Sequence, residues 1–263
     1  MGYRHHEVQR LRRLTTRRRS RRDESAFVVE GAKLLSESLA AGARVDTVFA
    51  GPDAPPELLA RALAAGARLV ELAPGVLERV ASTVTPQPVM AVVADVAVEL
   101  DALEGASLIV VCVDVGDPGN AGTVLRSAEA AGADGVVFCG HSVDVYNPKT
   151  VRASAGALFH VPVVATDEEP SRVLARVRSM GLRRLGAVVG SGHDYTTVDL
   201  THSVALVLGN EATGLPAALS DVLDDRVTIP MTGRSESLNV GMAAAVLCFE
   251  AARQRRSRER VRE

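Results

Sequence analysis

The 263-residue chain is long enough for two compact domains, and its 47% apolar and 24% charged residues are typical of a globular protein, not of a disordered one. No apolar stretch reaches the roughly 18 residues that a membrane-spanning helix needs, and no secretory h-region follows the N-terminus, so we expect a cytosolic protein. The net charge of −2 hides an asymmetry, because residues 1–22 hold nine Arg and one Glu and residues 253–263 hold six Arg and two Glu.

The basic N-terminus, residues 1–22, predicts an arm or helix that attracts a polyanion. Residues 17–22 read Arg-Arg-Arg-Ser-Arg-Arg, and pairing of such a block with phosphates releases counterions. A solvated, partly disordered arm is the alternative. Because the chain has only three Tyr, five Phe and no Trp, we expect arginine–phosphate contacts to outweigh base stacking, with Arg18 and Arg19 as candidates.

Residues 23–95 predict a small α/β domain made of short alternating elements. Apolar residues recur at helical spacing around Leu34 and Leu58, and Pro and Gly mark the ends of the elements. Strands are predicted at 27–29, 45–50, 68–72 and 89–94, and helices at 32–41, 55–66 and 74–81. Residues 96–106 have no strong period and are predicted to be a linker.

Residues 107–263 predict a second α/β domain with a parallel sheet. Its near-continuous Val, Leu and Ile runs indicate strands that helices cover on both faces. Strands are predicted at 108–113, 135–139, 160–164, 185–189, 204–208 and 226–229, and helices at 121–131, 148–157, 171–180, 216–223 and 238–253. Ligands of such sheets bind beyond the carboxyl ends of the strands.

Three polar, glycine-bearing segments follow predicted strands, at 116–122, 209–214 and 232–239. Within them, Asn120 and Ser237 are predicted to be N-caps of the helices that follow. The first segment has the glycine pattern G-x-x-G-x-x-G, without the acidic residue after the next strand that holds a ribose, which excludes a dinucleotide-binding loop. No Gly-Lys-Ser/Thr is present there, which excludes a P-loop.

Cysteine and histidine usage points away from metal or disulfide chemistry. The three cysteines, Cys112, Cys139 and Cys248, lie far apart beside aliphatic residues, with no C-x-x-C pair. We therefore expect buried thiols in a reducing compartment. The six histidines include no H-E-x-x-H, so no metal site is predicted.

Taken together, the three segments resemble the SpoU branch of the SPOUT methyltransferases. The pattern D-x-x-N-x-G-x-x-x-R-x-A runs from Asp117 to Ala128, L-x-L-G-N-E ends at Glu211, and I-P-M and S-L-N-V follow at 229–231 and 237–240. Residues 27–31, Phe-Val-Val-Glu-Gly after a basic helix, look like the start of the small substrate-binding domain, related to kink-turn RNA-binding ribosomal proteins, that precedes the catalytic domain in ribosomal-RNA members.

The resemblance implies a fold, a cofactor and an assembly. The sheet is expected to end in a deep trefoil knot through which residues 229–253 pass, although knots are rare in general. S-adenosylmethionine is expected to bind bent in the knot, and relatives are homodimers with active sites at the subunit interface. The implied cofactor residues are Gly209, Ile229, Leu238, Asn210, Val189 and Gly190. The run at 190–194 departs from the commoner Thr/Ala-rich version, which weakens the adenine-side assignment.

The resemblance also implies a catalytic set centred on Arg126, which activates the ribose 2′-hydroxyl with help from an RNA phosphate. A guanidinium has a pKa above about 12 and is a poor base, so we expect Arg126 to position phosphate and stabilise developing oxyanion charge. Asn120 is expected to orient that arginine or the ribose, and Glu211 to fix the loop, with Arg126 as a second candidate partner. Ser237 and Asn239 are expected to shape the pocket.

The predicted function is thus 2′-O-methylation of a ribose in RNA, most simply in 23S ribosomal RNA. The same chemistry on transfer RNA is one alternative, and a non-catalytic RNA-binding or ribosome-assembly protein is another. In relatives, an arginine that matches Arg152 contacts RNA phosphate; here an ordinary helix-surface arginine is the competing interpretation.

Overall fold

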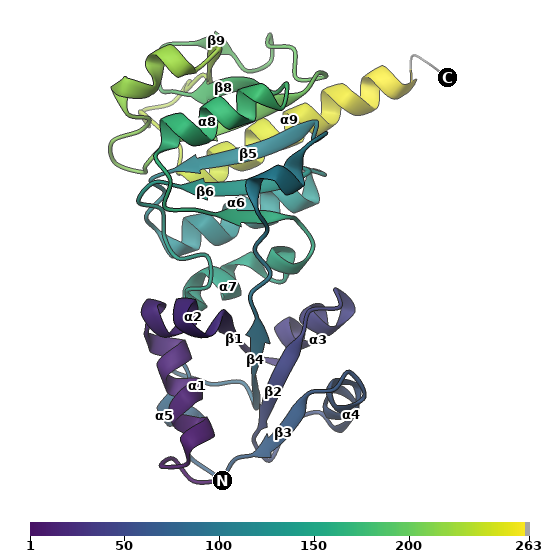
Figure 1. Ribbon diagram of the computed structural model, residues 1–263. Coiled ribbons are helices and arrows are strands. Elements are labelled where there is room, and N and C mark those ends of the chain that lie inside the picture. The colour runs from purple at the N-terminus through teal and green to yellow at the C-terminus, as the bar shows by residue number, and fades with distance from the viewer. Residues whose placement is uncertain (261–263) are drawn as a thin grey trace. The chain divides into compact units, whose positions relative to one another are not determined.

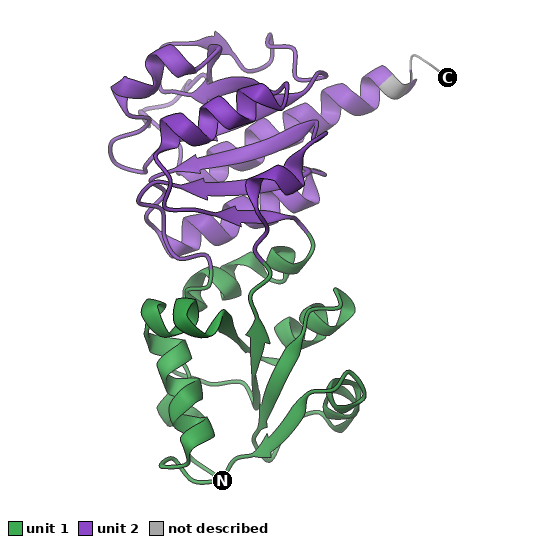
Figure 2. Ribbon diagram, viewed as in Figure 1, with its two compact units in different colours: residues 1–96, 146–160 green, residues 97–145, 161–263 purple. Residues whose placement is uncertain are grey.

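The computed structural model describes residues 1–260 and divides into two compact units (Figures 1 and 2). Unit 1 comprises residues 1–96 and 146–160, and unit 2 comprises residues 97–145 and those from 161 onward. Among the described residues, no helix combines the length and apolarity needed to cross a bilayer. Each unit has its own sheet and its own apolar core.

Unit 1 is built on a sheet with the strand order β1-β4-β2-β3, in which β4 is antiparallel to both β1 and β2, and β2 is parallel to β3. The strands are β1 (Ala26–Glu30), β2 (Val45–Ala50), β3 (Arg68–Glu71) and β4 (Val89–Ala94). The helices are α1 (His6–Thr16), α2 (Arg18–Glu24), α3 (Ala32–Ala40), α4 (Pro56–Ala64), α5 (Leu77–Val80), α7 (Pro148–Ser154) and the 3₁₀ turn η2 (Ala157–Phe159).

The basic N-terminus is part of the core of unit 1. Val8, Leu11 and Leu14 recur every three residues on α1, are fully buried, and belong to the same apolar cluster as Phe49 and Val92 of the sheet. This burial rules out the solvated arm that the charge pattern left open. The folded unit therefore starts well before residue 23, where composition placed the boundary. Composition missed this start because the three apolar residues of α1 stand among many arginines.

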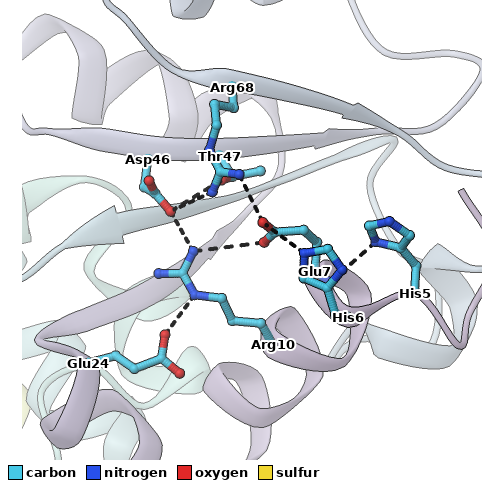
Figure 3. Close-up of polar contacts among 8 residues, drawn as sticks. All are labelled: His5, His6, Glu7, Arg10, Glu24, Asp46, Thr47 and Arg68. Atoms are coloured by element: carbon cyan, nitrogen blue, oxygen red, sulfur yellow. Dashed lines mark hydrogen bonds and ion pairs between the residues drawn. The ribbon is translucent and has the colours of Figure 1, made fainter.

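A polar network joins α1 to the sheet of unit 1 (Figure 3). Arg68 Nη1 donates to Glu7 Oε1 at 2.9 Å, and Arg10 donates to both Glu24 and Asp46. Burial would raise the pKa of Asp46, but the hydrogen bond and charge of Arg10 outweigh it and hold that pKa below its usual value. Arg10, one of the arginines that make the N-terminus basic, therefore serves the fold.

Unit 2 is built on a sheet with the order β7-β6-β5-β10-β8-β11-β9, in which every neighbouring pair is parallel. The strands are β5 (Leu108–Val113), β6 (Gly135–Cys139), β7 (Val163–Ala165), β8 (Arg183–Ala187), β9 (His193–Asp194), β10 (Val204–Leu208) and β11 (Asp225–Thr228). The helices are α6 (Pro118–Ala130), α8 (Pro170–Ser179) and α9 (Val240–Arg260), with 3₁₀ turns η1 (Leu100–Leu103) and η3 (Ala217–Val222). The predicted parallel α/β domain is confirmed.

Helices cover both faces of this sheet, as the aliphatic strands predicted (Figure 1). All six residues of β5 are buried, and alternate ones such as Ile109 and Val111 share an apolar cluster with Val173 and Leu174 of α8. Helices α6 and α9 pack together on the other side, and α9 also contacts β10. A strand buried on both faces has no polar positions, which explains the continuous apolar run.

Close approach of α6 and α9 depends on small residues at the start of α9. A Cβ added to Gly241 would lie only 2.8 Å from Thr123 Cγ2 of α6. Contacts this short do not occur between real side chains, so the two backbones approach as closely as they do because residue 241 is glycine.

Two chain segments belong to different units than the sequence suggested. Leu100 and Leu103, in the predicted linker, are buried in the core of unit 2. Residues 146–160, expected within the second domain, return to unit 1, where the Tyr146 ring stacks on Phe27 at a centroid distance of 4.4 Å. The helix predicted in this segment is α7. The regular alternation of strands and helices in the sequence does not indicate that α7 belongs to unit 1 while the elements before and after it belong to unit 2.

Candidate functional site

A cavity of about 760 Å³ lies in unit 2 at the carboxyl ends of β8, β10 and β11. Its volume is within the range of about 300–1,000 Å³ that is usual for small-molecule sites. Eight of the predicted site residues form part of its wall, namely Val189, Gly190, Gly209, Asn210, Glu211, Ile229, Ser237 and Leu238. The second and third polar segments therefore meet where parallel strands end.

Glu211 ties the first polar segment to this cavity wall. Its Oε1 accepts from Asn120 Nδ2 at 2.9 Å and from the backbone N–H of Asp117 at 3.0 Å, and its Oε2 accepts from the N–H of Gly116 at 3.1 Å. Partial burial raises the pKa of Glu211, but the hydrogen bonds from Asn120 and from the Asp117 and Gly116 backbone outweigh it, so the net pKa is lowered. Glu211 is held as a carboxylate.

Asn239 joins the third segment to the first. Its Nδ2 donates to Asn120 Oδ1 at 2.7 Å, while its Oδ1 accepts from the N–H of Gly241 at 2.9 Å at the start of α9. The N-cap role expected of Ser237 therefore falls to Asn239. The N-cap expected at Asn120 is likewise wrong, because Asp117 caps α6 and Asn120 N–H donates to it at 2.9 Å. The Asn120 side chain and the amide nitrogen of Asn239 thus make contacts between loops.

Asn210 and Gly209 shape the turn after β10. Asn210 Nδ2 donates to the carbonyl of Asp114 at 2.8 Å, and its Oδ1 accepts from Ala212 N–H at 2.9 Å. A Cβ on Gly209 would lie 2.3 Å from the carbonyl carbon of Gly214, so only glycine permits this tight turn. The three predicted segments therefore converge through hydrogen bonds, within one unit.

Arg126 lies outside the cavity wall. It is exposed on α6, and within residues 1–260 no hydrogen bond or ion pair of its side chain is found. It stands one helical turn after Thr123, the residue that meets the start of α9. Arg126 does not line the cavity of its own chain, although the helix that carries it is fixed to the pocket through Asn120.

The predicted RNA-contacting arginines lie in unit 1. Arg152 Nη1 is 3.6 Å from Glu30 Oε2 and also bonds to Ser82, with about a third of its side chain exposed. Arg18 and Arg19 are exposed on α2, and Arg19 Nε is 3.5 Å from Asp23. Arg17 and Arg22 of the basic block are exposed as well, but Arg21 differs from them. Arg21 is buried and donates to the carbonyl of Leu14 at 2.7 Å.

Sequence reasoning missed part of the cavity wall. The additional residues adjoin the predicted ones along the chain, and they include Thr213, Thr228, Met231 and Glu236. Their closeness in sequence to the three motifs could have identified them. A search for reactive residue types does not use that information. Asp114, whose carbonyl holds Asn210, was also missed.

The cysteines of the chain do not line this cavity. No cluster of His, Cys, Asp and Glu side chains suited to a metal ion occurs in the part of the chain that the structure describes. The three cysteines are buried, as predicted, and burial raises the thiol pKa of Cys139 and of Cys248 to about 12. These thiols stay protonated at neutral pH.

Comparison with known proteins gives two family matches that together cover most of the chain. Residues 107–249 match the SpoU rRNA Methylase family, and residues 5–91 match the MRM3-like substrate binding domain. Among curated relatives, the chain is similar to the 23S rRNA (guanosine(2553)-2′-O)-methyltransferase RlmP of Bacillus subtilis, at 32% identity over 88% of this chain and 90% of that protein.

Solved structures of similar proteins match this chain over nearly its whole length. The SpoU methyltransferase AviRb of Streptomyces viridochromogenes in complex with AdoMet superposes with a TM-score of 0.87 at 31% identity, covering 96% of this chain and all of that one. An AdoMet-bound rRNA methyltransferase from Sinorhizobium meliloti gives a TM-score of 0.84 at 30% identity, covering 94% of each chain. Both units are thus matched together.

Proposed function

This chain belongs to the SpoU rRNA methylase family, and we propose that it methylates a ribose 2′-hydroxyl of 23S ribosomal RNA with S-adenosylmethionine as methyl donor. The observation that carries the proposal is the hydrogen-bonded convergence of three distant loops on one cavity at the carboxyl ends of parallel strands. The similar proteins named above support both the cofactor and the substrate class.

The cavity residues fit this cofactor in size and chemistry. Val189, Ile229 and Leu238 supply apolar surface suited to an adenine ring, and Gly209 lets a ligand approach the backbone. We assign the backbone groups of Gly209, Ile229 and Leu238 to the cofactor, with Asn210 and Gly190 beside them. When bound, the sulfonium of S-adenosylmethionine supplies an electrophilic methyl group.

The residues around the cavity orient the nucleophile. Asn120 is fixed from both sides, because its Nδ2 donates to Glu211 and its Oδ1 accepts from Asn239. This arrangement holds the first turn of α6 and therefore the direction of the helix that carries Arg126. We assign to Arg126 the positioning of an RNA phosphate and the stabilisation of the 2′-oxygen as its proton leaves, since a guanidinium is a poor base. Ser237 completes the wall.

A second copy of the chain is proposed to complete the site. Met242 and Phe249 lie two helical turns apart on α9, with 60% and 46% of their surface exposed, and α9 packs against the helix of Arg126. A homodimer that covers this apolar surface would bring Arg126 to a partner's surface. Replacement of Phe249 by Lys is expected to give a monomer in sedimentation experiments, and an unchanged dimer would contradict this assembly. The trefoil knot implied for residues 229–253 stays a prediction.

Ribosomal RNA is the favoured substrate because unit 1 matches a substrate binding domain and because the similarity to AviRb extends over both units. Arg18 and Arg19 on α2, together with Arg152, are proposed phosphate contacts. Such contacts give a salt-dependent affinity, so removal of the two charges at 18 and 19 is expected to flatten the dependence of RNA binding on salt. We place this reaction in the cytoplasm, where ribosomal RNA is modified.

The direct test is transfer of a labelled methyl group from S-adenosylmethionine to purified 23S ribosomal RNA and, in parallel, to bulk transfer RNA. Primer-extension stops then locate the 2′-O-methyl group. Incorporation into 23S ribosomal RNA alone is expected. Incorporation only into transfer RNA would replace the substrate assignment, and no incorporation into either RNA, with RNA binding intact, would favour a non-catalytic assembly protein.

A further inference from the structure

The backbone at Asp114 adopts a conformation that residues other than glycine rarely adopt. Its φ is +55°, in the left-handed region, and among the described residues only Ser25 and Ala155 are other non-glycine positions with positive φ. Asp114 directly follows β5, next to the cavity loops, whereas the other two lie at helix ends in unit 1. Strained backbone of this kind persists where surrounding contacts hold it, and it gathers at functional sites.

On one side, the loop that starts at Asp114 is tied to the loop after β6. Asp114 Oδ1 accepts from His141 N–H at 2.7 Å, and the carbonyl of Val115 accepts from the N–H of Val143 at 2.9 Å. A Cβ on Gly140 would lie 2.4 Å from the same carboxylate oxygen, so the glycine makes room for it. The side chain of Asp114 thereby holds its own unusual backbone in place.

On the other side, the same loop supports the cavity wall. The Asp114 carbonyl accepts from Asn210 Nδ2, and the N–H groups of Gly116 and Asp117 donate to Glu211. The direction of all three backbone groups depends on the turn at residue 114. If its φ returned to the common negative range, the carbonyl would turn away from Asn210, and the two N–H groups would lose their aim at Glu211.

We propose that Asp114 is a positioning residue that sets the cofactor-binding form of the cavity wall, acting through Asn210 and Glu211. This inference rests on the proposed function, because it concerns the site assigned to S-adenosylmethionine. Asp114 contributes to the turn in two ways. It tolerates the left-handed backbone conformation, and its carboxylate oxygen accepts a hydrogen bond from the His141 N–H.

Three substitutions separate these contributions in the full-length protein. Asp114→Asn keeps both, because asparagine tolerates the left-handed region and retains an acceptor oxygen. Asp114→Gly keeps the backbone but loses the bond to His141, and Asp114→Ala loses both. Asp134→Ala is the matched control, since Asp134 accepts from the N–H groups of Ser107 and Leu108 at the opposite end of β5, far from the cavity loops along that strand.

The measurements are the Kd for S-adenosylmethionine by isothermal titration calorimetry, the Tm, and the KM for RNA. We expect the Kd to rise about tenfold in Asp114→Ala and severalfold in Asp114→Gly, and to stay within about threefold in Asp114→Asn, with the KM for RNA little changed. In the background of Asn210→Ala, Asp114→Ala should add less than it does alone, because both act through one contact. The control should lower the Tm and leave the Kd unchanged.

A purely structural role would appear as a lower Tm in Asp114→Ala and Asp114→Gly with a wild-type Kd, and it would overturn the proposal. So would full additivity with Asn210→Ala, or an Asp114→Asn variant as weak as Asp114→Ala. If Asp114→Ala does not fold, the comparison of the glycine and asparagine variants decides alone. Absence of binding by the wild-type protein would instead overturn the proposed function.

Discussion

Removal of the Glu211 carboxylate tests the convergence of the three loops most directly. Glu211→Ala deletes the acceptor of three hydrogen bonds, from Asn120 Nδ2 and from the N–H groups of Gly116 and Asp117. Hydrogen bonds to charged groups contribute about 1.5–3 kcal/mol when buried, but Glu211 is largely exposed, so about 0.7 kcal/mol each is a better value. Because these bonds hold the loops in the form that binds the cofactor, their sum of about 2 kcal/mol is the upper limit of the loss, which corresponds to a Kd for S-adenosylmethionine about 30-fold weaker.

Isothermal titration calorimetry measures this change, with Glu129→Ala, an exposed glutamate on α6, as the control. Glu211→Gln should also bind weakly, because its amide N–H₂ cannot accept from the backbone N–H groups. Since the pKa of Glu211 is lowered in the folded protein, the carboxylate network is complete above its ordinary pKa of 4.5 and is lost only as pH falls through the lowered value. An affinity within twofold of wild type in Glu211→Ala would refute the reasoning.

Three further variants probe catalysis, capping and the fold. Arg126→Ala should abolish methyl transfer while the Kd for S-adenosylmethionine stays within a few-fold, and retained turnover would discard its assignment. Asn239→Ala removes a helix cap and the bond to Asn120, so thermal unfolding should show a loss of about 1 kcal/mol, and an unchanged Tm would contradict the cap. Asp224→Asn breaks the bidentate ion pair with buried Arg184 and should lower the free energy of unfolding by about 2 kcal/mol. The hydrogen bond from Arg184 lowers the pKa of Asp224 to about 2, so the stability advantage of the wild type should persist from neutral pH to about 4 and vanish toward pH 2. Unfolding measured as a function of pH checks this.

The parallel sheet of unit 2 was predictable because its strands are buried on both faces. Such strands seldom hold a polar residue, so the run from Leu108 to Val113 is apolar throughout and stands out in the sequence. The position of the cavity followed from topology, because parallel strands bring their carboxyl ends to one edge. Loops as distant as 116–122 and 232–239 were therefore expected to meet, and Asn120 and Asn239 do hydrogen bond.

The parts that could not be predicted depend on competition between similar local signals. Asn120 and Asp117 are both good N-cap residues three positions apart, and the choice of Asp117 leaves the Asn120 side chain free to bond Glu211. Likewise, residues 146–160 have an ordinary helical pattern, and their membership of unit 1 depends on partners distant in sequence such as Phe27. Local patterns specify elements, whereas tertiary contacts decide which element a side chain serves.

Some arginines of this protein make contacts inside the fold and others are exposed on its surface, and only the structure distinguishes the two groups. Arg10 and Arg21 sit in the same basic stretch as Arg18 and Arg19, yet their guanidinium groups are committed to carboxylates and to backbone carbonyls. Truncation of residues 1–22 would delete the core residues of α1 along with the charge, so a loss of RNA binding in that variant would report unfolding. Arg126 is the opposite case: it is exposed, yet it lies on a helix that Asn120 fixes to the cavity. Because the helix fixes Arg126 while its guanidinium lies outside the cavity of the same chain, this residue is suited to contact a separate molecule such as the RNA substrate.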